Sequence, residues 1–437
     1  MKTRITRRHF LQSAAVATAG IATAGCNTLP SSTAARRVSP NEKLNIGVIG
    51  TQGRARGNIA GVKGENIVAL CDVDSDNLLK SGPEFPRAKH YTDFRKMLER
   101  KDLDAVVIST PDHTHAVCIV AALQSGRHVY CEKPLTHTVS EARIVTDLAK
   151  RTGLKTQMGN QIHSHPSGNY RRVVELIQSG AIGKVTEAHV WSGAKYGEMD
   201  LTPNPGPPPA NINYDLWQGP LPFTPYRPEY LPFKWRNFWA FGGGTLADFW
   251  CHYSDLPFWA LNLKYPATVE AEGAEPHPVF TTLDMKLNYL FPARGKDPEV
   301  RFTWYQGKYR PAHLLSPDQL KKFGSGVLFV GDKGMLISGY TNHLLLPEEK
   351  FKDFKAPEPF IKDSIGHHAE WIDAIKNNRW SGTDFSYAGP LTEAGLLGNV
   401  AHRAGRKLFW DPVNLKAIGC PEADEFIQHH YREGWKI

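Results

Sequence analysis

The sequence is poor in the patterns that disulfide frameworks and metal sites leave. Its 437 residues include six cysteines, and no two of them stand in a CxxC spacing. Histidine pairs occur at 113/115, 163/165 and 367/368, but no carboxylate follows at the fourth position and there is no HExxH segment. Such histidines in loops chelate poorly. We therefore expect no disulfide framework, no zinc knuckle and no metal centre.

Acidic residues are missing from the first 40 positions, which hold six lysines and arginines. Removing these six charges from the formal net charge of +8 leaves +2 for the rest of the chain. A body this close to neutral argues against a nucleic-acid-binding surface. The basic character belongs to the N-terminal tail.

That tail also lacks an apolar run long enough to span a membrane. It begins with basic residues, continues with a short, weakly apolar run and ends in small residues before Cys26, as an export signal does. RRHFL at 7–11 resembles the twin-arginine export signal of bacteria, and TAGC at 23–26 resembles a lipoprotein processing site with threonine where leucine is usual. We predict a signal and linker over 1–42 and a periplasmic protein, either free or anchored by a lipid on Cys26. A basic N-terminus without a sorting role is the alternative.

From residue 44 on, short apolar strands alternate with helical stretches. Continuously apolar strands are typical of a parallel sheet that is buried on both faces. Strands are expected at 44–50, 66–73, 104–110, 128–133 and 154–159, and helices at 54–62, 92–100, 113–125 and 139–151. This pattern predicts an α/β fold with a doubly wound parallel sheet, a Rossmann domain over 43–163.

The pattern changes after about residue 165. A Pro- and Trp-rich stretch at 195–240 is followed by longer strands with partial alternation, among them a hairpin expected to turn at Gly331–Gly334. Pro257 predicts that the helix before it is short or kinked. We expect a substrate-binding α/β domain with an open, mainly antiparallel sheet over 164–437.

A glycine-containing turn follows the first predicted strand. It reads GTQGRARG from Gly50, whereas the G-x-G-x-x-G pattern of dinucleotide sites would also place glycine at 52 and 55. Asp72 ends the second strand, where an acid holds the ribose hydroxyls and would repel the 2′-phosphate of NADP. We therefore predict NAD as the cofactor, with NADP as an alternative; an ordinary strand–helix turn is the other interpretation. The predicted contacts here are Gly50, Gln52, Gly53, Arg54 and Asp72.

Two further strands end in residues that fit a ligand site. Lys133 follows a buried strand and precedes Pro134, and a residue before proline is held in extended geometry. Lys133 should therefore project from the carboxyl end of its strand, where ligands bind in α/β sheets. Lys133 could instead be a solvated loop lysine. His115, which follows the strand at 104–110, could instead pack locally at the start of a helix. The additional cofactor contacts predicted here are Thr110, Pro111, His115, Glu132 and Lys133.

The motifs GVIG, CDVD, STPDHTH, CEKPL and GGGTLADFWCHYSD occur in this order along the chain. Over residues 43–410 the chain resembles the Gfo/Idh/MocA family of NAD(P)-dependent sugar and polyol oxidoreductases, and within it an exported branch. The resemblance implies a Rossmann domain followed by an α/β domain whose open sheet carries the substrate pocket and often an oligomer contact. It implies that Lys133, Asp248 and His252 are the catalytic residues, that the substrate is a small carbohydrate and that the protein is a homo-oligomer, dimer or tetramer.

The spacing of Asp248 and His252 agrees with these roles, because residues four apart on a helix share one face. Oxidation of an alcohol needs a base for the hydroxyl proton, and histidine titrates near neutral pH. Lys133 would hydrogen-bond the same oxygen, and Asp248 would orient the substrate or the histidine. A surface ion pair between Asp248 and His252 is the alternative.

Further candidates for substrate contacts lie in two segments. The stretch MGNQIHSHPSGNYRR leaves the last Rossmann strand, and a second group precedes the glycine run at 242–244. These residues could instead belong to a linker, to the core or to an interface. The candidate substrate residues are Gln161, His163, Tyr170, Arg236 and Trp239.

Export and NAD together pose a problem, because soluble NAD is a cytoplasmic cofactor. We therefore hypothesise a tightly held cofactor that is recycled in one active site. One compound is oxidised and a second reduced, or a glycoside is oxidised only transiently and cleaved without net redox change, with His163 or Tyr170 as second base. A non-catalytic sugar- or nucleotide-binding protein is the third alternative.

Overall fold

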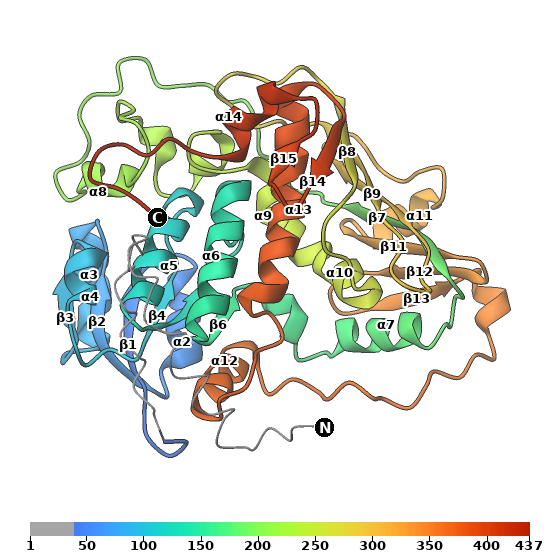
Figure 1. The fold of residues 1–437 in the computed structure, drawn as a ribbon, viewed down its shortest axis with the longest axis horizontal. Coiled ribbons are helices and arrows are strands. Elements are labelled where there is room, and N and C mark those ends of the chain that lie inside the picture. The colour runs from blue at the N-terminus through green and yellow to red at the C-terminus, as the bar shows by residue number, and fades with distance from the viewer. Residues whose placement is uncertain (1–38) are drawn as a thin grey trace, which may run out of the picture.

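The computed structural model describes residues 39–437 (Figure 1). The predicted export signal, most of the linker and Cys26 therefore lie outside the described residues. In the described part of the chain, no helix has the length and apolar character needed to cross a membrane.

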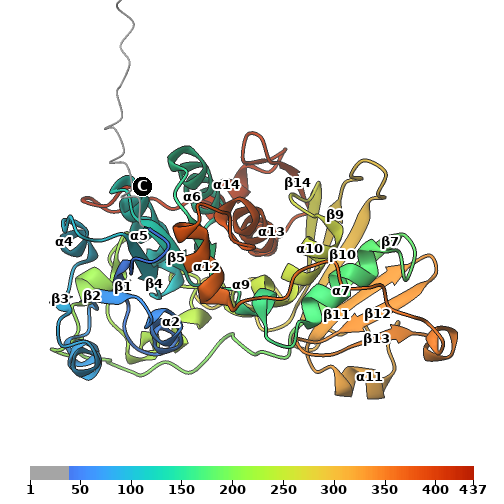
Figure 2. The same ribbon diagram turned by 90° about the horizontal axis from the view of Figure 1, so that it is seen from below.

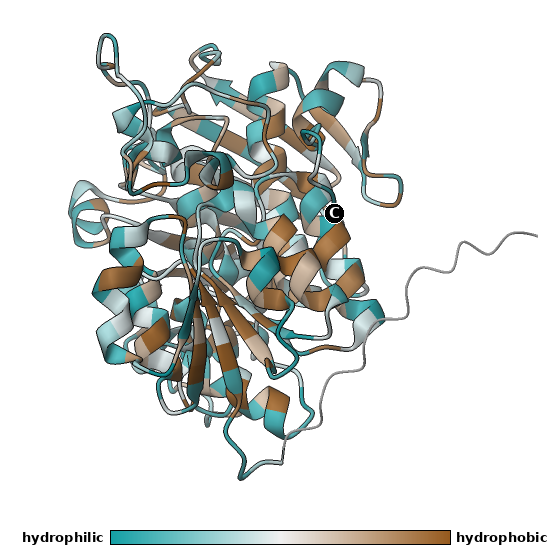
Figure 3. Ribbon diagram, turned by 90° about the vertical axis from the view of Figure 1, so that its left-hand side faces the viewer, coloured by the Kyte–Doolittle hydropathy of each residue, from teal (hydrophilic) through white to brown (hydrophobic). Residues whose placement is uncertain are grey.

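The first sheet has six parallel strands in the order β3-β2-β1-β4-β5-β6. Its strands are β1 (Asn45–Ile49), β2 (Asn66–Cys71), β3 (Lys89–Tyr91), β4 (Ala105–Ile108), β5 (His128–Cys131) and β6 (Thr156–Met158). The prediction of a Rossmann sheet is confirmed, and Figure 3 shows its strands as a fan of mostly hydrophobic residues. The sequence did not reveal β3, because its three residues are polar or aromatic and largely exposed at the sheet edge.

Helices cover both faces of this sheet, as the continuously apolar strands require. They are α2 (Ala55–Val62), α3 (Ser75–Ser81), α4 (Phe94–Leu98), α5 (His115–Gln124) and α6 (Val139–Thr152). The bounds of α6 follow from its sequence: Thr138 and Glu141 form a capping box at its start, and Gly153 ends it with a left-handed φ of 67°.

The second sheet has nine strands in the order β13-β12-β11-β7-β10-β9-β8-β14-β15. It is antiparallel except where β10 runs parallel to β7, which confirms the predicted mainly antiparallel sheet. The expected hairpin is present, with Gly331 paired to Gly334. The strands are β7 (Val185–Trp191), β8 (Thr268–Gly273), β9 (Met285–Phe291), β10 (Val300–Gln306), β11 (Gly326–Gly331), β12 (Gly334–Ser338), β13 (His343–Leu346), β14 (Leu408–Asp411) and β15 (Lys416–Ala417).

The helices after β6 are α7 (Asn169–Gln178), α8 (Tyr214–Gln218), α9 (Gly244–Tyr253), α10 (Asp255–Leu261), α11 (Pro317–Lys322), α12 (His367–Lys376), α13 (Phe385–Ala404) and α14 (Asp424–Ile427). Helices α7, α9, α10 and α13 pack on one face of the second sheet, and the short α11 packs on the other (Figure 2). Helices α8 and α12 lie against the first domain. The break between α9 and α10 lies at Ser254, where Pro257 in the first turn of α10 predicts it.

The C-terminal part of the chain returns to the first domain. Trp371 and Ile375 of α12 belong to the same apolar cluster as Ile46 and Val48 of β1, and α13 packs along α6. Residues after 164 therefore build the second sheet and also complete the core of the first.

Candidate active site

A cavity of about 860 Å³ lies between the carboxyl ends of the first sheet and helix α9. Clefts of this size at the carboxyl ends of parallel strands are the usual ligand sites of α/β proteins. Of the predicted site residues, those that line the cavity are Gly50, Gln52, Gly53, Arg54, Asp72, Thr110, Pro111, Glu132, Lys133, Gln161, Arg236, Asp248 and His252.

The turn after β1 has the backbone that a dinucleotide site needs. Gly50 has a φ of +80°, and a Cβ there would lie 2.7 Å from the carbonyl oxygen of Ser109. Only glycine fits this approach. Gln52, which stands where the usual pattern has glycine, donates from Nε2 to Ser81 Oγ at 2.7 Å. Its amide is therefore held by α3.

Asp72 lies at the end of β2 and closes one end of the cavity. Its Oδ2 accepts from the backbone N–H of Thr51 at 2.9 Å and from Thr51 Oγ1 at 3.0 Å, and its Oδ1 accepts from the backbone N–H of Asp74 at 3.0 Å. Burial raises the pKa of this carboxyl above its usual value, while these hydrogen bonds oppose the rise. The acid is fixed in place as an acceptor.

Glu132, directly after β5, contacts both the start of α2 and the segment that leads from the first domain to the second. Its Oε1 accepts from Arg54 Nε at 3.2 Å, from Asn58 Nδ2 at 2.9 Å and from Gln161 Nε2 at 2.8 Å. The Glu132 side chain is nearly buried, so these contacts offset the cost of removing its charge from water. Lys133, the next residue, thus projects from a braced position.

Lys133 reaches across the cavity to α9. Its Nζ donates to the backbone oxygen of Asp248 at 2.6 Å and to the Asp248 carboxylate. An ammonium has three donors, so among the described residues these two contacts leave one N–H for a ligand.

The Asp248 carboxylate contacts several charged and polar side chains of the cavity. Tyr196 Oη donates to its Oδ2 at 2.9 Å, and Arg236 Nε lies 3.3 Å from its Oδ1. Burial alone would raise the pKa of Asp248, but the charges of Lys133 and Arg236 outweigh it and lower that pKa well below the usual range. Asp248 therefore stays ionised and holds three cavity side chains. Its carboxylate orients Lys133, where we had expected it to orient His252 or the substrate.

His252 lies one turn further along α9 and also lines the cavity, as the four-residue spacing predicts. Its Nδ1 is buried and has no hydrogen-bond partner among the described residues. Burial, reinforced by the charge of Lys133, lowers the pKa of His252 to about 3. The imidazole is therefore neutral at neutral pH and has a lone pair, but it is a weaker base than the histidine with a near-neutral pKa that we had expected.

Two family models match the chain. Residues 44–160 match the "Oxidoreductase family, NAD-binding Rossmann fold" model, and residues 171–291 match the "Oxidoreductase family, C-terminal alpha/beta domain" model of the same family. The chain belongs to the Gfo/Idh/MocA oxidoreductase family.

Curated relatives of this Gfo/Idh/MocA protein include two glycosyl hydrolase family 109 proteins. That of Solibacter usitatus is 31% identical over 208 residues, which cover 44% of this chain and 46% of the relative. That of Shewanella pealeana is 29% identical over 209 residues, covering 42% and 44%. The chain thus matches less than half the length of these relatives.

Solved structures share the whole fold at low identity. The WlbA dehydrogenase of Bordetella pertussis, in complex with NADH and UDP-GlcNAcA, has a TM-score of 0.60 and 17% identity, with 86% of this chain and 99% of that chain covered. An aldose-aldose oxidoreductase of Caulobacter crescentus has a TM-score of 0.56 and 15% identity, with 84% and 100% covered.

The cofactor of this family member is NAD(P), and the residues present fit it. The turn at Gly50 lets backbone approach a pyrophosphate at the start of α2, and Asp72 offers oxygens to ribose hydroxyls. His252 lines the same cavity from α9, together with Lys133 and Asp248. Between these points the cavity is continuous.

His115 does not line the cavity. It is fully buried, with Nδ1 2.8 Å from the carbonyl oxygen of Pro134 and Nε2 2.8 Å from that of Thr110. The imidazole therefore braces the two loops that present Lys133 and Thr110. Its geometry indicates a positioning role for a residue that we predicted to touch the cofactor.

His163 and Tyr170 also lie outside the lining. His163 Nδ1 is 3.0 Å from Asp255 Oδ2 and its ring stacks on Trp259 at 3.9 Å. Tyr170 donates to the backbone oxygen of His252 at 3.0 Å. Both residues thus support α9 and α10 from behind the cavity.

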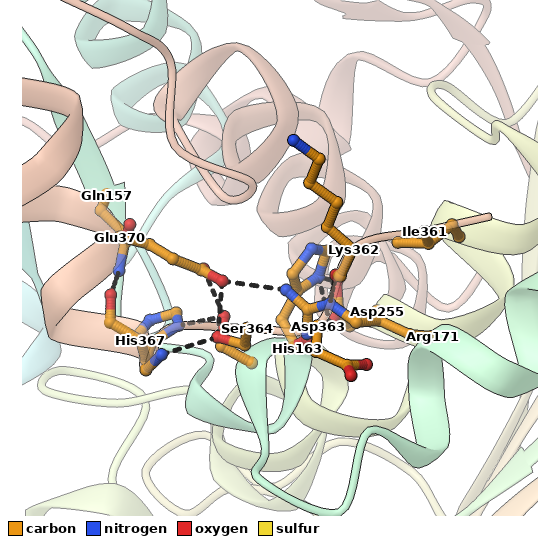
Figure 4. A network of polar contacts seen from close by, with 12 residues as sticks. Gln157, His163, Arg171, Asp255, Ile361, Lys362, Asp363, Ser364, His367 and Glu370 are labelled. Carbon is orange, nitrogen blue, oxygen red and sulfur yellow. Dashed lines mark hydrogen bonds and ion pairs between the residues drawn. The ribbon is translucent and has the colours of Figure 1, made fainter. Parts of the chain in front are cut away.

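The network around His163 joins the crossover segment to the C-terminal helices (Figure 4). Arg171 donates to the backbone oxygen of His163 at 2.6 Å and to Glu370 Oε1 at 2.9 Å, while Ser164 donates to Glu370 Oε2 at 2.6 Å. This network fixes the segment behind the cavity and accounts for the burial of His163, whereas Gln161 of the same segment does line the cavity.

Trp239, the last predicted substrate residue, is buried away from the cavity, where its Nε1 donates to the backbone oxygen of His277 at 3.0 Å. Arg236, by contrast, lines the cavity and stacks its guanidinium 4.1 Å from the ring of Trp235. No group of three histidine, cysteine or acidic side chains that could hold a metal occurs within residues 39–437.

Several cavity residues escaped sequence reasoning. Asp112 follows Pro111 in the segment PDHTH, whose neighbouring residues we had already assigned to the cofactor site. The local sequence does not show, however, that Asp112 is buried near Arg236 and Asp248. Burial raises the pKa of Asp112 to about 8. Tyr196, Tyr340 and Trp435 come from irregular or distant segments that carry no local signal. The lining residues missed in this way are Asp112, Tyr196, Tyr340 and Trp435.

Proposed function

We propose that this protein is an exported NAD(P)-dependent oxidoreductase that acts on a CH–OH group of a sugar, polyol or glycoside by hydride transfer. Lys133, Asp248 and His252 would form its catalytic set, and the cofactor would be held tightly. One observation carries the proposal: the free donor of Lys133 and the neutral imidazole of His252 line the cavity whose other end carries Gly50 and Asp72.

The cofactor supplies the acceptor for a hydride from the carbinol carbon. His252 accepts the hydroxyl proton, since its imidazole is neutral and one of its nitrogens lacks a partner. Lys133 donates its remaining N–H to the same oxygen and stabilises the negative charge that develops there. Asp248 keeps the ammonium in position, so the charge is fixed before the reaction begins.

A tightly held cofactor is proposed because the N-terminal segment has the features of an export signal. Outside the cytoplasm there is no NAD pool to replace a lost molecule. Twin-arginine export carries folded proteins, so the cofactor would be loaded before export. We also retain a homo-oligomer and a lipid on Cys26 as predictions.

A redox-neutral NAD-dependent glycosidase is the second candidate. It is favoured by the relatives that carry the name glycosyl hydrolase family 109. Transient oxidation would acidify a neighbouring C–H. A second base would take that proton, an acid would protonate the leaving group, water would add to the resulting double bond, and the hydride would return to the ketone, so that there is no net redox change. Asp112 is protonated at neutral pH because its pKa is raised, and it lines the cavity beside the catalytic set. Asp112 is therefore a candidate acid for the leaving group. The second base that takes the C–H proton is a separate role, and His163 and Tyr170, which we had expected there, lie behind the cavity.

Cofactor release tests the proposal. The mature protein is purified without added nucleotide and denatured, and the released molecules are identified by mass. Near-stoichiometric NAD or NADP is the expected result, and assays on free sugars and glycosides would then separate net oxidation from redox-neutral cleavage. A protein that emerges empty and also fails to bind added NAD would contradict the proposal and favour a non-catalytic sugar-binding protein.

A further inference from the structure

The last residues of the chain run from α14 back over the first domain (Figure 1), and Trp435 among them lines the cavity. His429 lies 2.7 Å from His137 between ring nitrogens, and Tyr431 donates to the Glu141 carboxylate at the start of α6. The segment 428–437, here called the C-terminal tail, thus crosses the Rossmann domain on its way to the chain end.

Arg432 fastens the tail to α8. Its Nε donates to the backbone oxygen of Gly219 at 2.7 Å, and its other nitrogens reach both the backbone oxygen and the carboxylate of Asp215. The backbone N–H of Arg432 also donates to the oxygen of Pro220 at 2.9 Å. These contacts hold the tail at a defined position three residues before Trp435.

Trp435 lines the cavity at its Asp72 end. Its ring lies 6.1 Å from that of Phe94 between centroids, and the Arg95 guanidinium lies 4.6 Å from the ring centroid. The indole is only half-buried, and contacts made by Tyr431 and Arg432 already anchor the tail. The chain therefore extends beyond its anchors to place an aromatic ring on the cavity wall.

The chemistry of that end identifies what the ring would cover. Asp72 offers its oxygens to the hydroxyls of the adenosine ribose, so the base attached to this ribose must lie in the same end of the cavity. The walls there include Val73, Thr92, Phe94 and Trp435. Purine rings pack favourably on aromatic faces.

We propose that Trp435 covers the adenine of the bound cofactor and that the tail, fastened by Arg432, slows cofactor release. The inference rests on NAD(P) binding in this cavity and on no particular substrate. It supplies a physical basis for the retention proposed above, since a cofactor enclosed by the tail can leave only after Trp435 moves.

Release kinetics test this inference. The full-length mature protein and its variants are loaded with NAD, diluted into a nucleotide trap and followed for released NAD. We expect Trp435→Ala to release NAD about tenfold faster, as the loss of one base–aromatic contact predicts. Trp435→Phe should stay within about threefold of the unchanged protein because it keeps a ring. Arg432→Ala should accelerate release because the tail loses its anchor.

A matched control and a second ligand distinguish loss of the adenine contact from a general disturbance of the fold. Trp380→Ala removes an exposed tryptophan outside the cavity and should leave release unchanged. On protein freed of nucleotide, Trp435→Ala should weaken ADP-ribose but leave nicotinamide mononucleotide, which has no adenine, unaffected. Release at the original rate, or equal weakening of both ligands, would overturn the inference. If the protein shows the expected release rates but no oxidoreductase activity, the inference about Trp435 is supported and the proposed function is contradicted.

Discussion

The two ends of the cavity are built on different principles. At the catalytic end, defined by Lys133, Asp248 and His252, the first domain and α9 face each other through a buried ion pair. At the adenine end, defined by Asp72, Phe94 and Trp435, aromatic rings line the wall beside acids that have no basic partner in the lining. The difference shows how one cavity can serve two needs: reaction requires charges fixed against each other, whereas retention requires a cover that can open.

Removing the charge at the catalytic end should have the largest effect. Lys133→Ala deletes the donor for the reacting oxygen, so we expect turnover to fall by about 10³-fold. NAD binding, measured by fluorescence or calorimetry, should persist because the adenine end is unchanged. Lys150→Ala, at an exposed position on α6, is the matched control. Retained turnover in Lys133→Ala would refute the catalytic assignment.

A substitution at Asp112 separates two reactions at the catalytic end, hydride transfer and cleavage of the glycoside. Asp112→Asn keeps the shape but cannot deliver a proton, so cleavage of a glycoside should fall by about 10²-fold while hydride transfer from the same substrate changes little. Both are read from one reaction, by product analysis and by the absorbance of reduced cofactor. Parallel loss of the two activities would assign Asp112 a structural role.

The adenine end is tested through Asp72. Asp72→Asn removes the negative charge that repels a 2′-phosphate, so the ratio of NAD to NADP affinity should fall by about tenfold, with NADP gaining. Binding of both nucleotides is measured by calorimetry. Asp76→Asn, a change on the neighbouring α3 that lies outside the cavity lining, should leave the ratio as it is. An unchanged ratio in Asp72→Asn would remove Asp72 from cofactor selection.

The smallest expected effect is one of pH. A base must be deprotonated, and because the pKa of His252 is lowered to about 3, its base form persists as the pH falls from 8 to 5. The kcat/KM for hydride transfer should then change by less than about twofold in this range. A histidine with an ordinary pKa near 6.5 would lose more than tenfold by pH 5. An acid limb near 6.5 would contradict the lowered pKa.

Sequence reasoning succeeded where a local pattern decides geometry. Asp248 and His252 share a face because they are four residues apart, Lys133 projects because it ends a strand before proline, and Gly50 is required by a turn whose φ is positive. Pro257 likewise marks the break between α9 and α10. These features depend on neighbours in the sequence.

The remaining residues depend on tertiary contacts and could not be found in this way. His163 and Tyr170 follow the last Rossmann strand, but their direction was set by Asp255 and by the backbone of His252. Asp112 stands in a recognisable segment, yet its raised pKa comes from burial. Trp435 lines the cavity because the tail returns to the first domain, where contacts of Tyr431 and Arg432 hold it.

The return of α12 to the first domain has a consequence for biosynthesis. Trp371 and Ile375 complete the apolar cluster beneath β1, so a nascent chain that has emerged as far as residue 163 leaves uncovered the part of that cluster on which α12 packs. At about 5–20 residues per second, the roughly 200 residues that separate it from α12 take about 10–40 s to translate. The domain that the ribosome makes first is thus completed only after much of the second domain has been made, and during that interval the apolar surface beneath α12 is open to chaperones and proteases.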